Sequence, residues 1–195
     1  DAIQDNDVLC LYEVPAQTMK SDDGGMVASG GVVSEYTDPG PGNHYRAHTF
    51  TSTGTFQVSE LSTQVPNNVD VLVVGGGGAG GFRVGSSHPV SPSPGVYSIT
   101  VGSGGRGTNA GTYNASLQNS PGSPSIFDTI TSQGGGKGGE AGGGDPGGSG
   151  GGSVTTNTIG SGNRVTGTAT PAPSQGNDGG IGVSSPSYCG GGGGG

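Results

Sequence analysis

The sequence predicts an all-β protein in which short antiparallel strands lead into a glycine-rich bundle of extended polyglycine II helices, with essentially no α-helix. Glycine (47) and proline (13) supply 60 of the 195 residues, and with serine and threonine they interrupt every candidate helix past residue 60. Leu, Ile, Val and Phe total 33 residues, or 17% of the chain, below the roughly 20% expected of an ordinary packed core. Short apolar runs of strand length precede the glycine clusters.

The first region, residues 1–43, is acidic. Residues 1–40 hold eight acidic side chains and one basic one. Two short strands are expected, at residues 8–12 (VLCLY) and around residues 32–33, and DPGPGN at residues 38–43 ends the region. We interpret residues 1–43 as an attachment or subunit-packing segment, with a simple solvated face as the alternative.

The second region, residues 44–105, is predicted to be rich in β-structure. The segment YRAHTFTSTGTFQV has Thr and aromatic residues with a period of two, and a turn is expected near residues 52–54. Further strands are expected at residues 69–74 (VDVLVV) and 95–101 (GVYSITV). These segments would pair as strands, because unpaired apolar strands are prone to aggregate.

The third region, residues 106–195, is dominated by glycine, with 26 Gly among the 62 residues from 134 to 195. Glycine does not recur strictly at every third position, which excludes collagen. A disordered linker is an alternative that composition allows. We favour ordered threefold extended helices, because glycine backbones can approach closely and bond to neighbouring helices through N–H and C=O groups that a lone helix leaves unpaired.

Two glycine motifs resemble nucleotide-binding loops, but each lacks residues that such a loop requires. Gly75, Gly77 and Gly80 satisfy G-x-G-x-x-G after a strand, but the following FRVGSSHPVSPSPG cannot be helical and no acidic residue occurs between residues 71 and 127. In GGGKGG, the residue after Lys137 is glycine where a phosphate loop needs Ser or Thr. No cofactor is therefore expected, and the glycines Gly75, Gly77, Gly80 and Gly143 are interpreted as structural.

No catalytic or metal site is predicted. His44, His48 and His88 are the only histidines, and we interpret them as ordinary surface or cross-strand residues. The aspartates at residues 5–7 and 22–23 lack the spacing of a calcium loop. No nucleophile elbow or catalytic triad can be assigned. The chain is thus predicted not to be an enzyme.

Charge and hydropathy exclude two kinds of partner. A net charge of −8 argues against binding to nucleic acid, which requires a basic surface. The sequence contains no run of 18 apolar residues, so we expect no insertion into a membrane. The two cysteines, Cys10 and Cys189, lie near opposite ends of the chain. The sequence leaves open whether they form a disulfide.

The order of five motifs resembles the glycine-rich domain of bacteriophage tail fibres and adhesins. The motifs are HTFTSTGTFQV, VDVLVVGGGGAGGF, PGVYSITVGSGG, GSPSIF and GGGKGG, and the resemblance covers roughly residues 44–195. It implies a β-rich portion followed by packed polyglycine helices whose intervening loops contact a host receptor. Members of that family usually end in a strand of the type GIVIIRY, which this sequence does not contain. A neighbouring subunit or a longer chain would supply it.

The leading hypothesis is a non-enzymatic virion protein, a subunit of a tail fibre or related appendage. It would associate with itself, as a trimer or helical polymer, with other virion proteins, and with a host surface glycan or protein. Phe82, Tyr113 and Tyr188, in the insertions at residues 82–94, 108–121 and 183–188, are the aromatic candidates for receptor contact; packing between helices or subunits is the alternative for them. A second hypothesis is a secreted bacterial surface protein that forms an extracellular filament through strands such as residues 69–74. Ice binding by a flat glycine-rich face is a third.

Overall fold

The structure is a computed structural model of the chain, and it describes residues 9–13, 25–40, 44–77, 80–107, 120–139, 144–153, 175–184 and 187–188. These residues form strands and extended segments, with no helix among them. The strands are β1 (Leu9–Glu13), β2 (Val27–Ser29), β3 (Val32–Thr37), β4 (His44–Phe50), β5 (Gly54–Glu60), β6 (Asn68–Val74), β7 (Phe82–Pro89), β8 (Val96–Thr100), β9 (Ser125–Phe127), β10 (Ile130–Ser132), β11 (Val183–Ser184) and β12 (Ser187–Tyr188).

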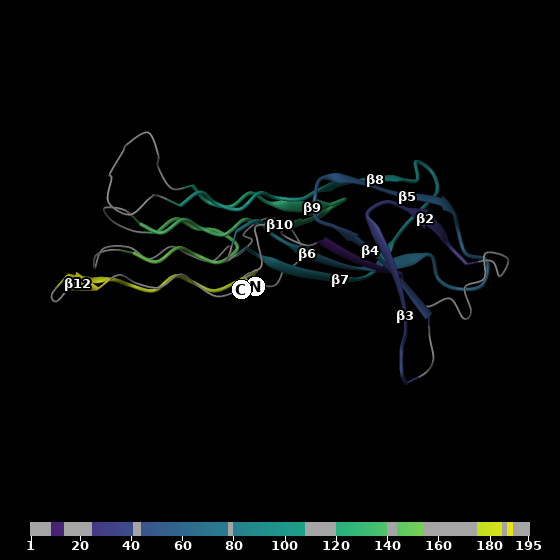
Figure 1. Cartoon of the computed structure of the whole chain (residues 1–195), viewed down its shortest axis with the longest axis horizontal. Coiled ribbons are helices and arrows are strands. Elements are labelled where there is room, and N and C mark those ends of the chain that lie inside the picture. Colours follow the sequence, from purple (N-terminus) through teal and green to yellow (C-terminus); the bar gives the residue numbers. More distant parts are fainter. Residues whose placement is uncertain are drawn as a thin grey trace.

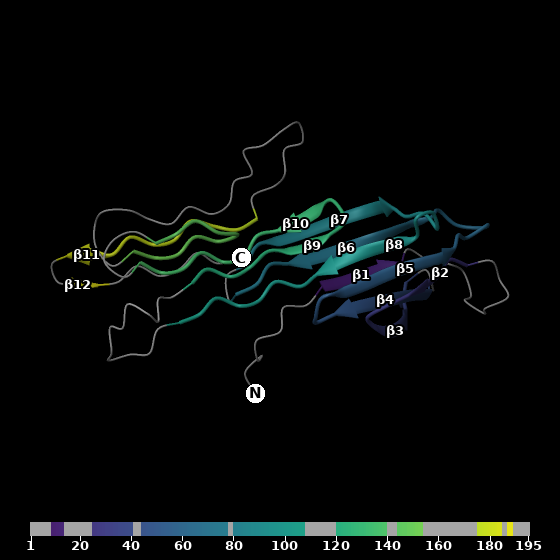
Figure 2. The same cartoon turned by 90° about the horizontal axis from the view of Figure 1, so that it is seen from above.

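Ten of these strands form two five-stranded sheets that pack face to face (Figures 1 and 2). Sheet A has the order β3-β4-β1-β6-β7, and sheet B has the order β10-β9-β8-β5-β2. Every strand pair is antiparallel. The predicted all-β, antiparallel fold class is therefore confirmed for the described residues.

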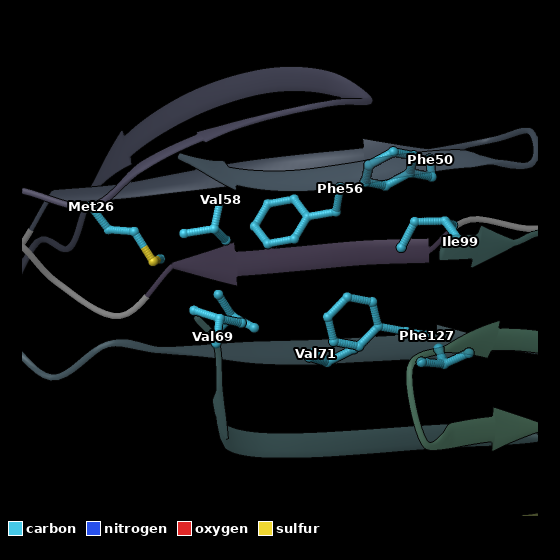
Figure 3. Packing of buried hydrophobic residues seen from close by; sticks show 10 residues of the cluster. Met26, Phe50, Phe56, Val58, Val69, Val71, Ile99 and Phe127 are labelled. Carbon is cyan, nitrogen blue, oxygen red and sulfur yellow. The ribbon is translucent and has the colours of Figure 1, made fainter. Parts of the chain in front are cut away.

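The core lies between the two sheets and consists mostly of alternate residues of their strands, together with Met26 and Val90 next to strand ends. Along β6, Val69, Val71 and Val73 are buried while the residues between them are partly exposed, as the period of a strand requires. Figure 3 shows Val69 and Val71 facing aromatic and aliphatic side chains of sheet B. The cluster comprises Met26, Phe50, Phe56, Val58, Val69, Val71, Val73, Val90, Ile99 and Phe127.

Most strands predicted between residues 44 and 101 are confirmed. The alternating segment that begins at residue 44 forms β4 and β5, joined at residues 51–53, and the two β-branched runs form β6 and β8. Strands also form in the acidic region: β3 extends from the predicted Val32, and β1 lies between β4 and β6 in the middle of sheet A. Strands from all three predicted regions thus take part in the two sheets.

One expectation for this region is wrong. The glycine-poor insertion at residues 82–94 was expected to be a loop, but its first eight residues form β7, because they pair with β6 across a bulge near Val69 and Val71. Of the two alternatives given for His48, a surface or a cross-strand residue, the structure has the second: His48 lies opposite Val33 of β3, and its side chain is fully buried. The register explains this position, since His48 shares the inward face of β4 with Phe50.

Candidate functional site

The most distinctive part of the molecule is a set of extended segments that run side by side away from the two sheets (Figures 1 and 2). We call them the glycine bundle. Their residues are 75–77, 101–107, 120–124, 133–139, 144–153 and 175–182. They lie outside the two five-stranded sheets, yet many of their glycines are buried. What holds them together must therefore be the backbone.

Three of these segments are mutual neighbours. The N–H of Gly76 donates to the carbonyl of Ser123, that of Gly122 donates to Gly135, and that of Gly135 donates back to Gly76, each at 2.9 Å. In a sheet, the first and third of three strands lie about 9.5 Å apart, too far for a hydrogen bond. The segments at residues 75–77, 120–124 and 133–139 consequently form a triangle in cross-section rather than a sheet.

A second triangle shares the segment at residues 133–139. The N–H of Gly148 donates to Gly134 at 2.7 Å, that of Gly136 donates to Ser149 at 2.9 Å, and that of Gly151 donates to Asp145 at 3.0 Å. Residues 144–148 and 149–153 therefore bond to each other and to residues 133–139. The shared segment bonds to four others, whereas a strand in a sheet has at most two neighbours.

Outer segments join this framework by the same kind of bond. The N–H of Ser123 donates to Ser103 at 2.9 Å, which attaches residues 101–107. On the other side, Gly150 donates to Asn177 at 2.9 Å and Ser153 donates to Gly180 at 3.1 Å. Packing on several sides is what the predicted polyglycine II bundle requires. The threefold helical conformation of each segment stays a prediction.

Close approach of the backbones leaves no room for side chains at most glycines of the bundle. A Cβ atom at Gly122 would overlap the carbonyl of Gly76, and one at Gly151 would overlap the carbonyl of Lys137. Equivalent overlaps with backbone atoms of another segment occur at Gly75, Gly76, Gly102, Gly105, Gly134, Gly136, Gly144, Gly147, Gly148, Gly176 and Gly179. By contrast, the nearest atom to a Cβ at Gly138 is 3.9 Å away, and none lies within 4 Å at Gly107.

The glycines singled out from the sequence differ in what their positions require. At Gly75 a Cβ would overlap the carbonyl of Gln133, and at Gly80 it would overlap the carbonyl of Gly75. At Gly77 the nearest atom is 3.7 Å from the Cβ position, but φ is +98°, where residues with side chains are strained. At Gly77, backbone conformation rather than close packing is therefore what requires glycine. Gly143 lies outside the described residues.

A buried glutamine joins the glycine bundle to the two sheets. Gln175 is 3% exposed. Its Oε1 accepts a hydrogen bond from the N–H of Gln133 at 2.8 Å, its Nε2 donates to the carbonyl of Thr131 at 3.2 Å, and its own carbonyl accepts from the N–H of Phe82 at 3.1 Å. Sequence reasoning missed this residue, because one glutamine in a polar, glycine-rich stretch carries no pattern that marks it as buried.

The two candidates for receptor contact that the structure describes, Phe82 and Tyr188, lie in different sheets. Phe82 begins β7, where the sheets meet the glycine bundle, and is 51% exposed. Tyr188 ends β12, which lies with β11 at the end of the molecule farthest from β2 and β3 (Figures 1 and 2). Tyr113 lies outside the described residues. Cys189 also lies outside them, so whether it forms a disulfide with Cys10 stays open.

In the part of the chain that the structure describes, the charged and titratable side chains form scattered pairs rather than one cluster. Lys137, from the rejected phosphate-loop motif, lies 3.7 Å from the carboxylate of Asp145 (Nζ to Oδ2). His44 Nδ1 lies 2.9 Å from Thr37 Oγ1 on the neighbouring strand, and His88 Nε2 lies 3.0 Å from Asp128 Oδ2. Among the described residues, no three His, Cys, Asp or Glu side chains gather where they could hold a metal ion. The aspartates at residues 5–7 and 22–23 lie outside the described residues.

The buried His48 has a shifted pKa. Its Nδ1–H donates to the carbonyl of Gly30 at 2.8 Å, and its ring packs edge-on against Phe56. Burial lowers the pKa of His48 below its ordinary value; the bond to Gly30 opposes this and the charge of Arg46 adds to it. The neutral form is therefore the one that the fold favours.

Comparisons with protein-family models, with curated proteins and with solved structures each found no match to this chain. The described residues also contain no helix long and apolar enough to cross a membrane.

Proposed function

We propose that this chain is a non-enzymatic structural subunit of a bacteriophage tail fibre or related virion appendage, and that it assembles as a homo-oligomer in the virion. The observation that supports the proposal most is the pair of hydrogen-bonded triangles that share residues 133–139. A bundle bonded on several sides resists bending in more than one direction, unlike a single layer of strands. Such a bundle is suited to holding one surface at a distance from another.

The two ends of the molecule then take different roles. The sheets, with their hydrophobic core, lie at one end, and β11 and β12 lie at the other (Figure 2). We assign attachment to other subunits and virion proteins to the sheets. Contact with a host surface glycan or protein is assigned to the β11–β12 end. Of the aromatic candidates, this division favours Tyr188 over Phe82.

Paired alanine variants test that division. We expect Tyr188→Ala to lower adsorption of particles to host cells at least tenfold, and Phe82→Ala to leave adsorption within twofold of the parent. Adsorption is measured as the rate at which free particles disappear from a host suspension. Equal losses in both variants, with normal particle assembly, would contradict the assignment of the contact to this end.

The second candidate function is a secreted bacterial surface protein that forms an extracellular filament. The exposed edge strand β3 is compatible with this candidate, because pairing of edge strands can join subunits. Electron microscopy of the native assembly, with an antibody against the purified chain, decides between the two. Label on a tail or capsid appendage is the expected result. Label confined to free filaments without particles would overturn the virion proposal in favour of the filament.

A further inference from the structure

Strand β3 has the features of a strand-pairing site. Among the described residues it is the outermost strand of sheet A and pairs with β4 alone. All six of its residues are exposed, including Val32 at 70% and Val33 at 48%. It has no Pro or Lys, two residues that commonly protect sheet edges from further pairing, and its one charged residue is Glu35. Figure 1 shows it extending beyond the body of the two sheets.

The other sheet edges are poor partners for it. β2 has three residues and an irregular register at Val27 and Ala28. β7 contains Pro89 and a bulge, and β10 has three residues and contacts β7. The run at residues 69–74, which the filament hypothesis expected to pair between subunits, lies within β6 and pairs on both sides, with β1 and β7. The long, regular edge that matches β3 is therefore another β3.

We propose that β3 of one copy pairs antiparallel with β3 of a second copy, with the two-fold axis at Ser34. This inference rests on the self-association in the proposed function and names the surface that carries it. Sheet A of each copy would continue into sheet A of the other across the axis. The interface would be isologous, so that each contact between two different residues occurs twice.

The register follows from geometry. Two residues directly opposite in an antiparallel pair share one face and one hydrogen-bonding role, so the residue numbers of each pair must have an even sum. With Ser34 opposite Ser34, Val32 lies opposite Tyr36 on one face, and Val33 lies opposite Glu35 on the other. A β-branched residue beside an aromatic one is a favourable cross-strand pair.

Neighbouring registers are less favourable. Moving the axis to Glu35 places two carboxylates directly opposite each other, which is destabilising. Moving it to Val33 shortens the paired stretch. In the Ser34 register each Glu35 keeps its partner within its own copy, because Nη2 of Arg46 donates to its Oε1 at 2.8 Å. The carboxylate therefore needs no partner from the second copy.

The contact is small. Pairing of six-residue strands alone falls short of the about 1,000 Å² that a stable complex usually buries. We therefore expect a weak dimer in the purified chain, which dissociates on dilution and is reinforced where subunits are held close together in an assembly.

Opposite charges at the axis test both the strand and the register. In sedimentation equilibrium of the purified chain, Ser34→Asp and Ser34→Lys should each weaken dimerisation at least tenfold. An equimolar mixture of the two should recover it to within about threefold of the parent, because each Asp then faces a Lys. Failure of the mixture to associate better than either variant alone would overturn the register.

A second pair of variants separates the edge from the exposed face of the sheet. Val32→Lys, in β3, should weaken the dimer at least tenfold, whereas Val84→Lys, in β7 at a similar 65% exposure, should have no effect. Equal effects, a purely monomeric parent chain or a purified trimer would each overturn the proposal. These measurements do not use virions, so a dimer found here stands even if microscopy places the chain outside a virus particle.

Discussion

Glycines two residues apart in one sequence run differ in what surrounds them. Gly136 and Gly138 both belong to GGGKGG, yet a Cβ at Gly136 would overlap the carbonyl of Asp145, while the nearest atom at Gly138 is 3.9 Å away. Neither has a φ in the left-handed region. The comparison therefore isolates packing from backbone conformation.

We expect Gly136→Ala to destabilise the chain by about 1–3 kcal/mol or more, because two backbones must move apart. Gly138→Ala should be neutral or stabilising by up to about 1 kcal/mol, because alanine reduces the freedom of the unfolded chain. Thermal unfolding of the two variants checks this. Equal melting temperatures would show that residues 133–139 do not pack as described.

The buried His48 predicts a pH dependence of stability. Because burial lowers its pKa, the folded chain holds this proton more weakly than the unfolded chain. The contribution of His48 is fully present above its unfolded pKa of about 6.5 and is lost as the pH falls toward the folded pKa. In that interval the slope from this residue approaches about 1.4 kcal/mol per pH unit.

Urea unfolding at about pH 7.5 and about pH 5.5 measures this effect. His48→Gln, which keeps an N–H that can donate to Gly30, should flatten the dependence, while His44→Gln, at an exposed position, should leave it unchanged. If the parent and His48→Gln lose stability in parallel on acidification, another group is responsible.

At the scale of elements, strands whose own sequence alternates β-branched residues could be predicted. Strands that form only because they pair with another strand could not. β6 and β8 have clear strand patterns in sequence. FRVGSSHP contains Gly, two Ser and a final Pro, so nothing local indicates a strand, and β7 forms through its pairing with β6. The central place of β1 likewise depends on partners far away in sequence, Phe50 among them.

Substitution of Gln175 tests whether this buried side chain stabilises the junction between the glycine bundle and the two sheets. Gln175→Leu keeps the side chain close in size but leaves the N–H of Gln133 and the carbonyl of Thr131 without their buried partner. We expect a loss of about 1–3 kcal/mol for each group that stays unsatisfied. The same substitution at Gln57, an exposed residue of β5, should change stability by less than about 0.5 kcal/mol. Matching urea midpoints in the two variants would exclude a role for the glutamine at the junction.

At the scale of the whole molecule, the composition predicted that backbone hydrogen bonds stabilise much of the chain, but not which segments they join. The low content of large apolar residues indicated that backbone bonds must stabilise much of the chain. Which segment bonds to which could not be predicted, because glycine has no side chain whose pattern would specify a partner. The triangles around residues 133–139 are therefore a property of the fold that sequence reasoning could not supply.

The measurement that tests this description most directly is residue-resolved hydrogen exchange of the backbone amides. We expect the amides of Gly76, Gly122, Gly135 and Gly148, which donate across the bundle, to exchange as slowly as amides of β6, because opening them requires the segments to separate. Exchange of these glycines at the rate of an unstructured peptide, with β6 still protected, would contradict a packed glycine bundle and leave only the two sheets as ordered structure.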